Sequence, residues 1–167
     1  VIVGHNERIA WGVTNNYPDV QDLFIERYDP SDANKVEVNG SFVPLTTREE
    51  VIQIKGGGSE TLTVRTSRNG PLIEQVWGPA RRAFEANTPV GDVTLGQGYG
   101  LAMRWTALEP GRLFQAVLKL DRAANWDEFR DALHDWNVPS QNVIYADIDG
   151  NIGYQMPGWV PQRKGGD

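Results

Sequence analysis

The first hundred positions alternate apolar and polar residues in short runs that glycine, proline and asparagine separate. This pattern predicts β-strands joined by tight turns. Asn39-Gly40 suits a type I′ hairpin turn because both residues accept positive φ angles, and Gly56-Gly57-Gly58 suits a turn between two antiparallel strands. Residues 79–97 are expected to be irregular. The expected strands cover residues 8–14, 22–28, 35–38, 41–45, 49–55, 60–65 and 99–106.

After position 112 the apolar spacing changes to three and four residues, which predicts a helical pair near residues 112–136, with Asn125 as the N-cap of the second helix. The strand pattern then returns in a hairpin over residues 142–156 that turns at Asp149-Gly150. The fold class is therefore α+β with mostly antiparallel strands. The apolar positions of the two helices are Leu113, Ala116, Val117, Leu120 and Ala124, then Trp126, Phe129, Leu133 and Trp136.

Charge and composition exclude several classes of function. The 167 residues contain 16 Lys and Arg against 22 Asp and Glu, a net charge of −6, so a nucleic-acid partner is not expected. The absence of cysteine excludes disulfides, thiolate nucleophiles and Cys-ligated zinc. No apolar run approaches the ~20 residues of a membrane span, so membrane insertion is not expected either.

The two ends of the sequence suggest a piece of a longer polypeptide. Val1 starts directly in strand-like sequence without a Met, and residues 162–167 end in a loop. We therefore expect residues 1–167 to form a single partial domain.

Three features carry candidate chemistry, and each has a plainer interpretation. Asp19-Val20-Gln21-Asp22 offers oxygen ligands of the kind that calcium prefers, although spacing alone favours a solvated turn. Asn142 precedes a strand, where a side-chain amide can donate into an oxyanion hole or simply form an Asx turn. Arg163 can orient an anionic group, although a lone loop arginine rarely does. None of the five serines lies in a nucleophile elbow.

Five blocks of the sequence together resemble the penicillin amidase (penicillin acylase) family of N-terminal-nucleophile hydrolases. They occur in the family's order and spread over nearly the whole chain, which makes the resemblance specific. The strongest is the last block, with its Asn-x-x-Tyr-Ala-Asp and Gly-Asn-Ile-Gly-Tyr strings. The blocks are residues 4–15, 19–26, 68–71, 125–129 and 141–154.

The resemblance implies part of a four-layer αββα sandwich and an amidase mechanism. In that family a precursor cleaves itself, and the new amino-terminal Ser of the larger β chain attacks an amide with its own α-amine as base. The blocks place this chain inside the β chain, so Val1 is not the nucleophile and the isolated chain should be inactive. The implied partners are the rest of the β chain, the α chain from the same precursor and a small-molecule amide, and the implied location is periplasmic or extracellular.

The resemblance also assigns roles to single residues. Asn142 matches the asparagine whose side-chain amide helps form the oxyanion hole, and Asn15 matches the position whose backbone amide is the second donor. Arg163 matches an arginine that orients the site. Tyr17 occupies a position that the family commonly fills with an aromatic residue beside the acyl pocket.

Calcium is the cofactor that the resemblance implies. Asp19 and Asp22 match the two aspartates of the family's calcium loop, with the carbonyl of Gln21 between them, and further ligands would come from outside this chain. The ion would be structural.

Two questions stay open at this stage. The polar loop after Asn15 does not decide among phenylacetyl, glutaryl and fatty acyl groups. The rival interpretation is a non-catalytic, calcium-stabilised, β-rich module that binds a ligand or another protein through its aromatic residues.

Overall fold

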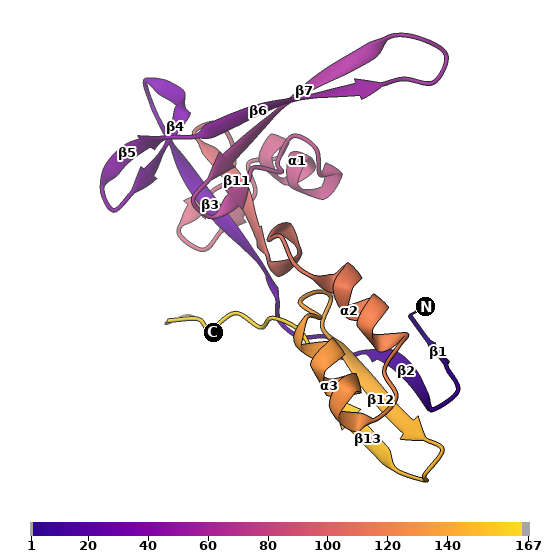
Figure 1. Cartoon of the computed structure of the whole chain (residues 1–167). Helices are drawn as coiled ribbons and strands as arrows, with labels where there is room; N and C mark the ends of the chain where they lie inside the picture. The colour runs from indigo at the N-terminus through magenta and orange to yellow at the C-terminus, as the bar shows by residue number, and fades with distance from the viewer. Residues whose placement is uncertain (1, 165–167) are drawn as a thin grey trace. The chain divides into compact units, whose positions relative to one another are not determined.

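The computed structural model describes residues 2–164, and it divides the chain into two compact units (Figure 1). The first unit combines residues 1–20 with residues 105–167, and the second comprises residues 21–104. The expectation about Val1, and the end of the expected terminal loop at residues 165–167, lie outside the described residues. That the chain forms a single partial domain stays a prediction.

The first unit is built on a four-stranded antiparallel sheet in the order β1-β2-β12-β13. Successive side chains of each strand point to opposite faces of this sheet. Trp11 and Tyr145 lie opposite each other and are buried on one face, and the residues next to them in sequence point to the other face. The β12–β13 hairpin turns at Gly150, which has a φ of 88°, as its Asp-Gly sequence predicts. The strands are β1 Gly4–His5, β2 Ile9–Asn15, β12 Gln141–Asp147 and β13 Ile152–Gln155.

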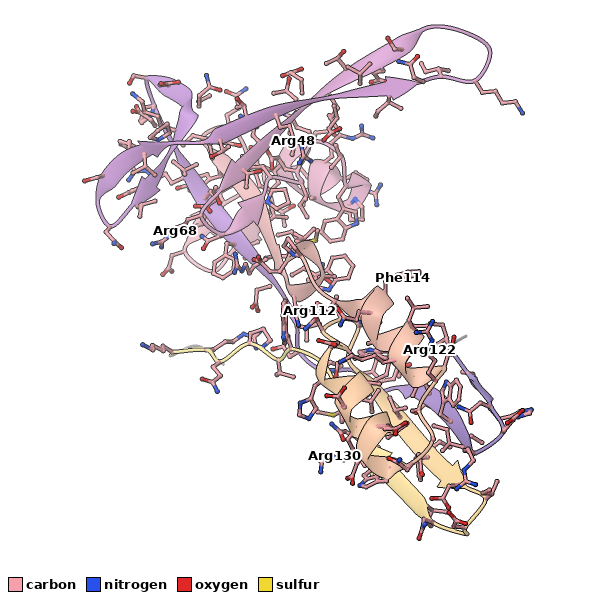
Figure 2. All side chains as sticks on the ribbon, in the orientation of Figure 1. Arg48, Arg68, Arg112, Phe114, Arg122 and Arg130 are labelled. Atoms are coloured by element: carbon pink, nitrogen blue, oxygen red, sulfur yellow. The ribbon has the colours of Figure 1, made fainter. Side chains whose placement is uncertain are left out.

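The expected helical pair covers one face of this sheet. It consists of α2, Leu113–Leu120, and α3, Trp126–His134. Asn125 caps α3 as predicted: its Oδ1 accepts from the backbone N–H of Glu128 at 3.0 Å, and Glu128 Oε2 accepts from the N–H of Ala124 at 2.8 Å. Both helices bury apolar side chains against β2 and β12, and Phe114 on the outer side of α2 stays 78% exposed (Figure 2).

Aromatic rings fill the layer between α3 and the sheet. Trp126 stacks on Phe129 with ring centroids 5.3 Å apart, and Tyr145 packs within 5.1 Å of both rings. Gly153 lies directly beneath the Trp126 ring, so that a Cβ at this position would collide with it. The opposite face of the sheet, with Ile152 at 88% exposure, is left uncovered by the two helices.

At the far end of β12, Asp147 organises the hairpin turn. Its two carboxylate oxygens accept from Asn151, from the N–H of Asp149 and from the Tyr145 hydroxyl. The Asn151 side-chain hydrogen bond is the main cause that keeps the pKa of Asp147 below its usual value, and burial raises the pKa of Tyr145 to about 12. The Asp147 carboxylate thus accepts these hydrogen bonds from residues of its own hairpin.

The second unit contains the other expected strands. Asn39 and Gly40 have φ angles of 52° and 79° and form the predicted hairpin turn, and the three glycines from Gly56 all have positive φ. One sheet has the order β11-β3-β4-β5, and a second has the order β6-β7-β8. The strands of this unit are β3 Gln21–Asp29, β4 Asp32–Val38, β5 Ser41–Pro44, β6 Thr46–Gln53, β7 Ser59–Ser67, β8 Gly70–Pro71, β9 Pro89–Val90, β10 Val93–Thr94 and β11 Tyr99–Trp105.

One expectation about this unit is wrong. Residues 79–97 were expected to be irregular, yet they contain most of the helix α1, Gly78–Glu85, followed by the short β9–β10 pair. Pro79 lies in the first turn of α1, where its missing N–H has no helical partner in any case. Eight residues form too few helical turns for a clear apolar period. The Gly78-Pro79 start was therefore interpreted as the end of regular structure rather than as the beginning of a helix.

Buried polar contacts join the strands of the second unit. The Glu26 carboxylate accepts from the Ser67 hydroxyl at 2.5 Å and from the Asn69 amide at 2.9 Å. The Arg65 guanidinium donates to both Tyr28 and Glu74, and burial followed by the Glu74 charge raises the pKa of the Tyr28 phenol. Asn69, in the block of residues 68–71, therefore takes part in these structural contacts.

None of the helices in residues 2–164 is both long enough and apolar enough to cross a membrane.

Gly153→Ala should destabilise the folded protein by about 1–3 kcal/mol, because the new Cβ forces Trp126 out of its position. The measurement is thermal or denaturant unfolding of the protein that carries this chain. Gly12→Ala is the matched control, since its Cβ would meet only the Ile144 side chain at an ordinary 3.4 Å. Equal losses in both variants would contradict the packing role of Gly153.

Candidate active site

The two candidate oxyanion donors lie together where β2 ends and β12 begins. In the antiparallel register Asn142 is opposite Thr14, and Gln141 is opposite Asn15. The Asn142 side chain reaches across this pair: its Nδ2 donates to Thr14 Oγ1 at 3.2 Å and to the carbonyl oxygen of Asn15 at 3.1 Å. The structure thus brings together two residues that lie 127 positions apart in the sequence.

The backbone N–H of Asn15 points to the opposite edge of β2. Backbone groups along a strand alternate between its two neighbours. The Gln141 N–H donates to the carbonyl of Pro157, on the β13 side. Gln141 and Asn15 therefore form a non-hydrogen-bonded pair of the antiparallel ladder. The Asn15 N–H therefore faces away from β12, while β1 pairs with Ala10 and Trp11 at the other end of the strand.

Tyr154 on β13 forms a hydrogen bond with the side chain of Asn142. Its hydroxyl donates to Asn142 Oδ1 at 2.7 Å. Reasoning from the sequence assigned no role to Tyr154, because the face that it occupies depends on the length of the turn. Residues 148–150 separate the paired Asp147 and Asn151, which places Tyr154 opposite Ile144, on the same face as Asn142. A two-residue turn at Asp149-Gly150 would have placed it opposite Tyr145, on the other face. Thr14, Asn142 and Tyr154 form a polar line across three strands, which we call the amide line.

The loop after β2 is anchored to the start of β12. The Asn16 amide donates to the Ser140 hydroxyl at 2.8 Å, which in turn donates to the carbonyl of Pro157 at 2.8 Å. Ser140 is buried, so this chain of hydrogen bonds is shielded from water. Asn16 and Ser140 thus fix the start of this loop, and the sequence did not single them out because neither stands in a recognisable motif.

Tyr17 follows in this loop with an uncommon conformation. Its φ is 50°, in the left-handed region that few bulky residues adopt, and its side chain is 87% exposed. An aromatic ring held open to solvent by a strained backbone is typical of a binding position rather than of a packing one.

Arg163 contacts Asp19. Its Nη1 lies 3.2 Å from Asp19 Oδ2 and donates to the Asp19 carbonyl oxygen at 3.3 Å. This pair joins the segment after β13 to the loop after β2. Arg163 thus contacts the end of that loop that is farther from Asn15. The structure thereby pairs two predicted site residues whose connection the sequence did not indicate.

The predicted calcium ligands fall into different units. Asp19 belongs to the first unit, whereas Gln21 and Asp22 begin β3 in the second. Within residues 2–164 there is no group of three or more His, Cys, Asp and Glu side chains suited to a metal ion. Carboxylate and carbonyl oxygens fit calcium in kind, but the three donors fall short of its six to eight ligands.

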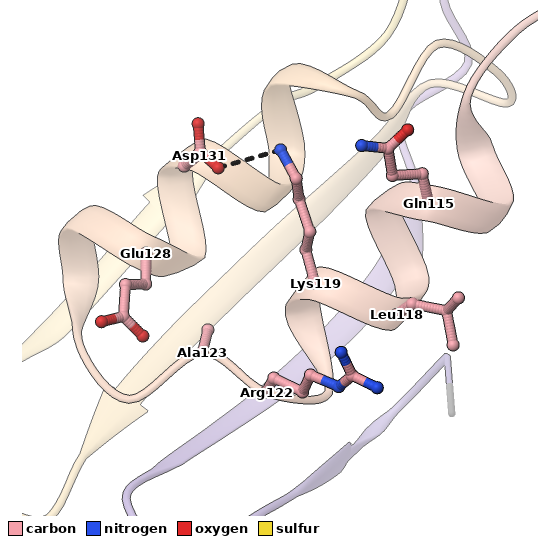
Figure 3. Close-up of a pocket in the computed structure, with 7 residues that line it drawn as sticks. All are labelled: Gln115, Leu118, Lys119, Arg122, Ala123, Glu128 and Asp131. Carbon is pink, nitrogen blue, oxygen red and sulfur yellow. Dashed lines mark hydrogen bonds and ion pairs between the residues drawn. The ribbon is translucent and has the colours of Figure 1, made fainter.

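Two further pockets are lined by none of the amide-line residues. One lies between α2 and α3 (Figure 3). There the Lys119 ammonium forms ion pairs with Asp131 at 3.0 Å and with Asp135 at 2.8 Å, which balance its charge. These helices cover the face of the sheet opposite to Asn142. The other is an apolar pocket of the second unit, about 330 Å³ in volume, that Leu23 and Trp77 help to line.

Comparisons with known proteins identify relatives over the whole chain. The acyl-homoserine lactone acylase QuiP of Pseudomonas fluorescens Pf-5 is 30% identical over all of this chain, which spans 19% of the relative. Penicillin G acylase of Escherichia coli is 30% identical over 99% of the chain and 18% of the relative. The chain thus spans about a fifth of the length of the curated relatives it matches.

A solved structure confirms the fold. The thermostable penicillin G acylase from Alcaligenes faecalis matches 98% of this chain and 26% of its own, with a TM-score of 0.75 and 29% identity. The mostly antiparallel strands and the helical pair expected from the sequence agree with this relative. The family model described as penicillin amidase matches residues 1–167. The chain therefore belongs to the penicillin amidase family.

Proposed function

We propose that this chain is part of an amidohydrolase that cleaves a linear amide through an acyl-enzyme. The nucleophile would be an amino-terminal Ser elsewhere in the same β chain, freed by self-cleavage of a precursor. Membership of the family supports this proposal, as do relatives named as penicillin and acyl-homoserine lactone acylases. The observation that carries it is the Asn142 amide held beside Asn15 at the ends of two paired strands.

In the proposed reaction the serine oxygen attacks the amide carbonyl carbon and its proton passes to the α-amine. The carbonyl oxygen becomes an oxyanion, and its collapse breaks the C–N bond and releases the amine with that proton. Water then hydrolyses the acyl ester. This chain would supply the electrostatic part: the Asn142 side-chain N–H and the Asn15 backbone N–H. Each donor in comparable sites is worth about 2.7–4 kcal/mol of barrier.

The Asn142 amide needs one adjustment to act in this way. Its Nδ2 has two hydrogens, which bond to Thr14 Oγ1 and to the carbonyl of Asn15. The Thr14 bond is the one to be exchanged, because a hydroxyl can turn and find another partner while the Asn15 carbonyl stays in place.

Arg163 and Tyr17 would act around these donors. We assign Arg163 to holding the loop after β2 through Asp19, which orients the backbone of Asn15. We assign Tyr17 to contact with the acyl group, because its ring is exposed in a strained loop next to Asn15. The acyl group itself stays open among phenylacetyl, glutaryl and fatty acyl chains.

The remaining assignments rest on the family. Calcium would be held by Asp19, the Gln21 carbonyl and Asp22, completed by ligands outside this chain, and would stabilise the loop rather than take part in the reaction. The rest of the β chain and the α chain of the same precursor would be the partners. Export to the periplasm or beyond is the location that we propose.

Asn142→Ala in the mature enzyme should lower kcat by roughly 10²–10³ with little change in melting temperature, because it removes an oxyanion donor from a half-exposed position. Hydrolysis of phenylacetyl, glutaryl and decanoyl p-nitroanilides measures the effect. Asn151→Ala, at the far end of the same hairpin, is the control and should retain kcat. Activity of Asn142→Ala within a few-fold of wild type would refute its role, and a parent protein inactive on all amides would favour a binding module.

Tyr17→Gly should raise KM several-fold without loss of stability, because glycine adopts a φ of 50° freely while the aromatic contact disappears. Steady-state kinetics and thermal unfolding of the mature enzyme measure both effects. Asn39→Gly is the matched control, since Asn39 also has positive φ but lies in a hairpin turn of the second unit. An unchanged KM for every acyl group tested would remove Tyr17 from the binding site.

Asp22→Ala should lower the melting temperature in calcium and make it insensitive to EDTA, because the loop loses a carboxylate ligand. Thermal unfolding of the purified enzyme with calcium or with EDTA is the measurement. Asp92→Ala, in a different turn of the same unit, should keep the wild-type calcium response. If the wild-type protein melts at one temperature in both conditions, the calcium assignment is wrong.

A further inference from the structure

We infer that Tyr154 is a positioning residue of the amidase, holding the Asn142 amide in the orientation that the oxyanion requires. This inference rests on the proposed function and concerns a residue to which the family resemblance assigned no role. It starts from the hydrogen bond of 2.7 Å between the Tyr154 hydroxyl and Asn142 Oδ1.

Strand register makes this contact specific. Tyr154 pairs directly with Ile144, and Asn142 is the next residue of β12 on the same face. The two side chains are therefore diagonal neighbours, a separation that a tyrosine can span and a short side chain cannot. Tyr154 is 57% exposed, on the face of the sheet that α2 and α3 leave uncovered.

The hydrogen-bonding capacities of the neighbours decide which way the amide faces. The carbonyl of Asn15 only accepts, so it must meet Nδ2, whereas the hydroxyls of Thr14 and Tyr154 can donate or accept. With Nδ2 directed to Asn15, Oδ1 faces β13 and needs a donor, which Tyr154 supplies. The hydroxyl thus completes the orientation that the Asn15 carbonyl begins.

The same hydrogen bond should strengthen Asn142 as a donor. An amide whose oxygen accepts a hydrogen bond is more polarised, so its N–H groups bind an anion more strongly. This gain appears only when negative charge develops on the substrate. Loss of Tyr154 should therefore affect kcat and leave KM nearly unchanged.

The backbone beneath Tyr154 is fixed from the other face of the sheet. Gly153 lies against the Trp126 ring, and Trp126 packs against Phe129 and Tyr145 in the core. Because adjacent side chains of a strand point to opposite faces, this close approach holds β13 while Tyr154 extends toward Asn142.

The test is a double-mutant cycle in the mature enzyme, with the p-nitroanilide substrate that the wild type hydrolyses best. Tyr154→Phe keeps the ring and removes only the hydroxyl, so kcat should fall roughly 3- to 10-fold, as for one hydrogen bond, with KM within twofold. In the Asn142→Ala background the same change should have no further effect on kcat. Tyr145→Phe is the control, since its hydroxyl binds Asp147 at the far end of β12.

The outcomes separate this inference from the proposed function. If Asn142→Ala lowers kcat strongly but Tyr154→Phe is neutral, or lowers kcat equally in both backgrounds, Tyr154 does not position Asn142 and only the inference fails. If Asn142→Ala itself retains activity, the oxyanion role fails and the inference falls with it. Melting temperatures of all variants exclude a general loss of structure as the cause.

Discussion

The antiparallel pairing of β2 with β12 is the constraint on which the rest of the first unit depends. It joins residues 9–15 to residues 141–147 over seven consecutive pairs, although more than a hundred residues of chain separate the two strands. The pairing places Thr14 opposite Asn142 and Trp11 opposite Tyr145, so one register sets both the amide line and the aromatic core. A slip by one residue would turn Asn142 toward the helices and Val143 to the open face.

The two faces of this sheet divide structural and chemical tasks. One face carries Trp11, Val143 and Tyr145 into the core beneath α2 and α3. The other carries small or apolar residues such as Gly12 and Ile144, interrupted by the polar amide line. Buried aromatic packing on the first face supports the hydrogen-bonded groups on the second. In the proposed function this support keeps the oxyanion donors in place before charge develops.

Local patterns predicted most of the fold, because each strand and turn depends on a few neighbouring residues. Asn39 and Gly40 specify their hairpin through positive φ, and Gly150 supplies the positive φ of the second hairpin turn. Asn125 caps its helix through a side chain three residues from its partner. The misread segment, α1, is too short for a period to emerge. Contacts that require pairing of distant segments, such as Asn142 with Asn15 or Arg163 with Asp19, cannot be read from spacing. The family resemblance named those residues without showing what they touch.

The polarity of the candidate site is itself informative about the chemistry. Thr14, Asn142 and Tyr154 are neutral groups, and the Arg163 guanidinium is paired with Asp19. At the amide line itself, negative charge that develops on a substrate would therefore meet dipoles. A neutral amide enters such a site without electrostatic bias, and only its transition state, with charge on the carbonyl oxygen, gains from the donors. This differential is what acceleration of amide hydrolysis requires, whereas an exposed cation would bind anionic ground states just as well. In the proposed function, the amide line therefore acts on the charge that develops during the reaction rather than on charge that a substrate already carries.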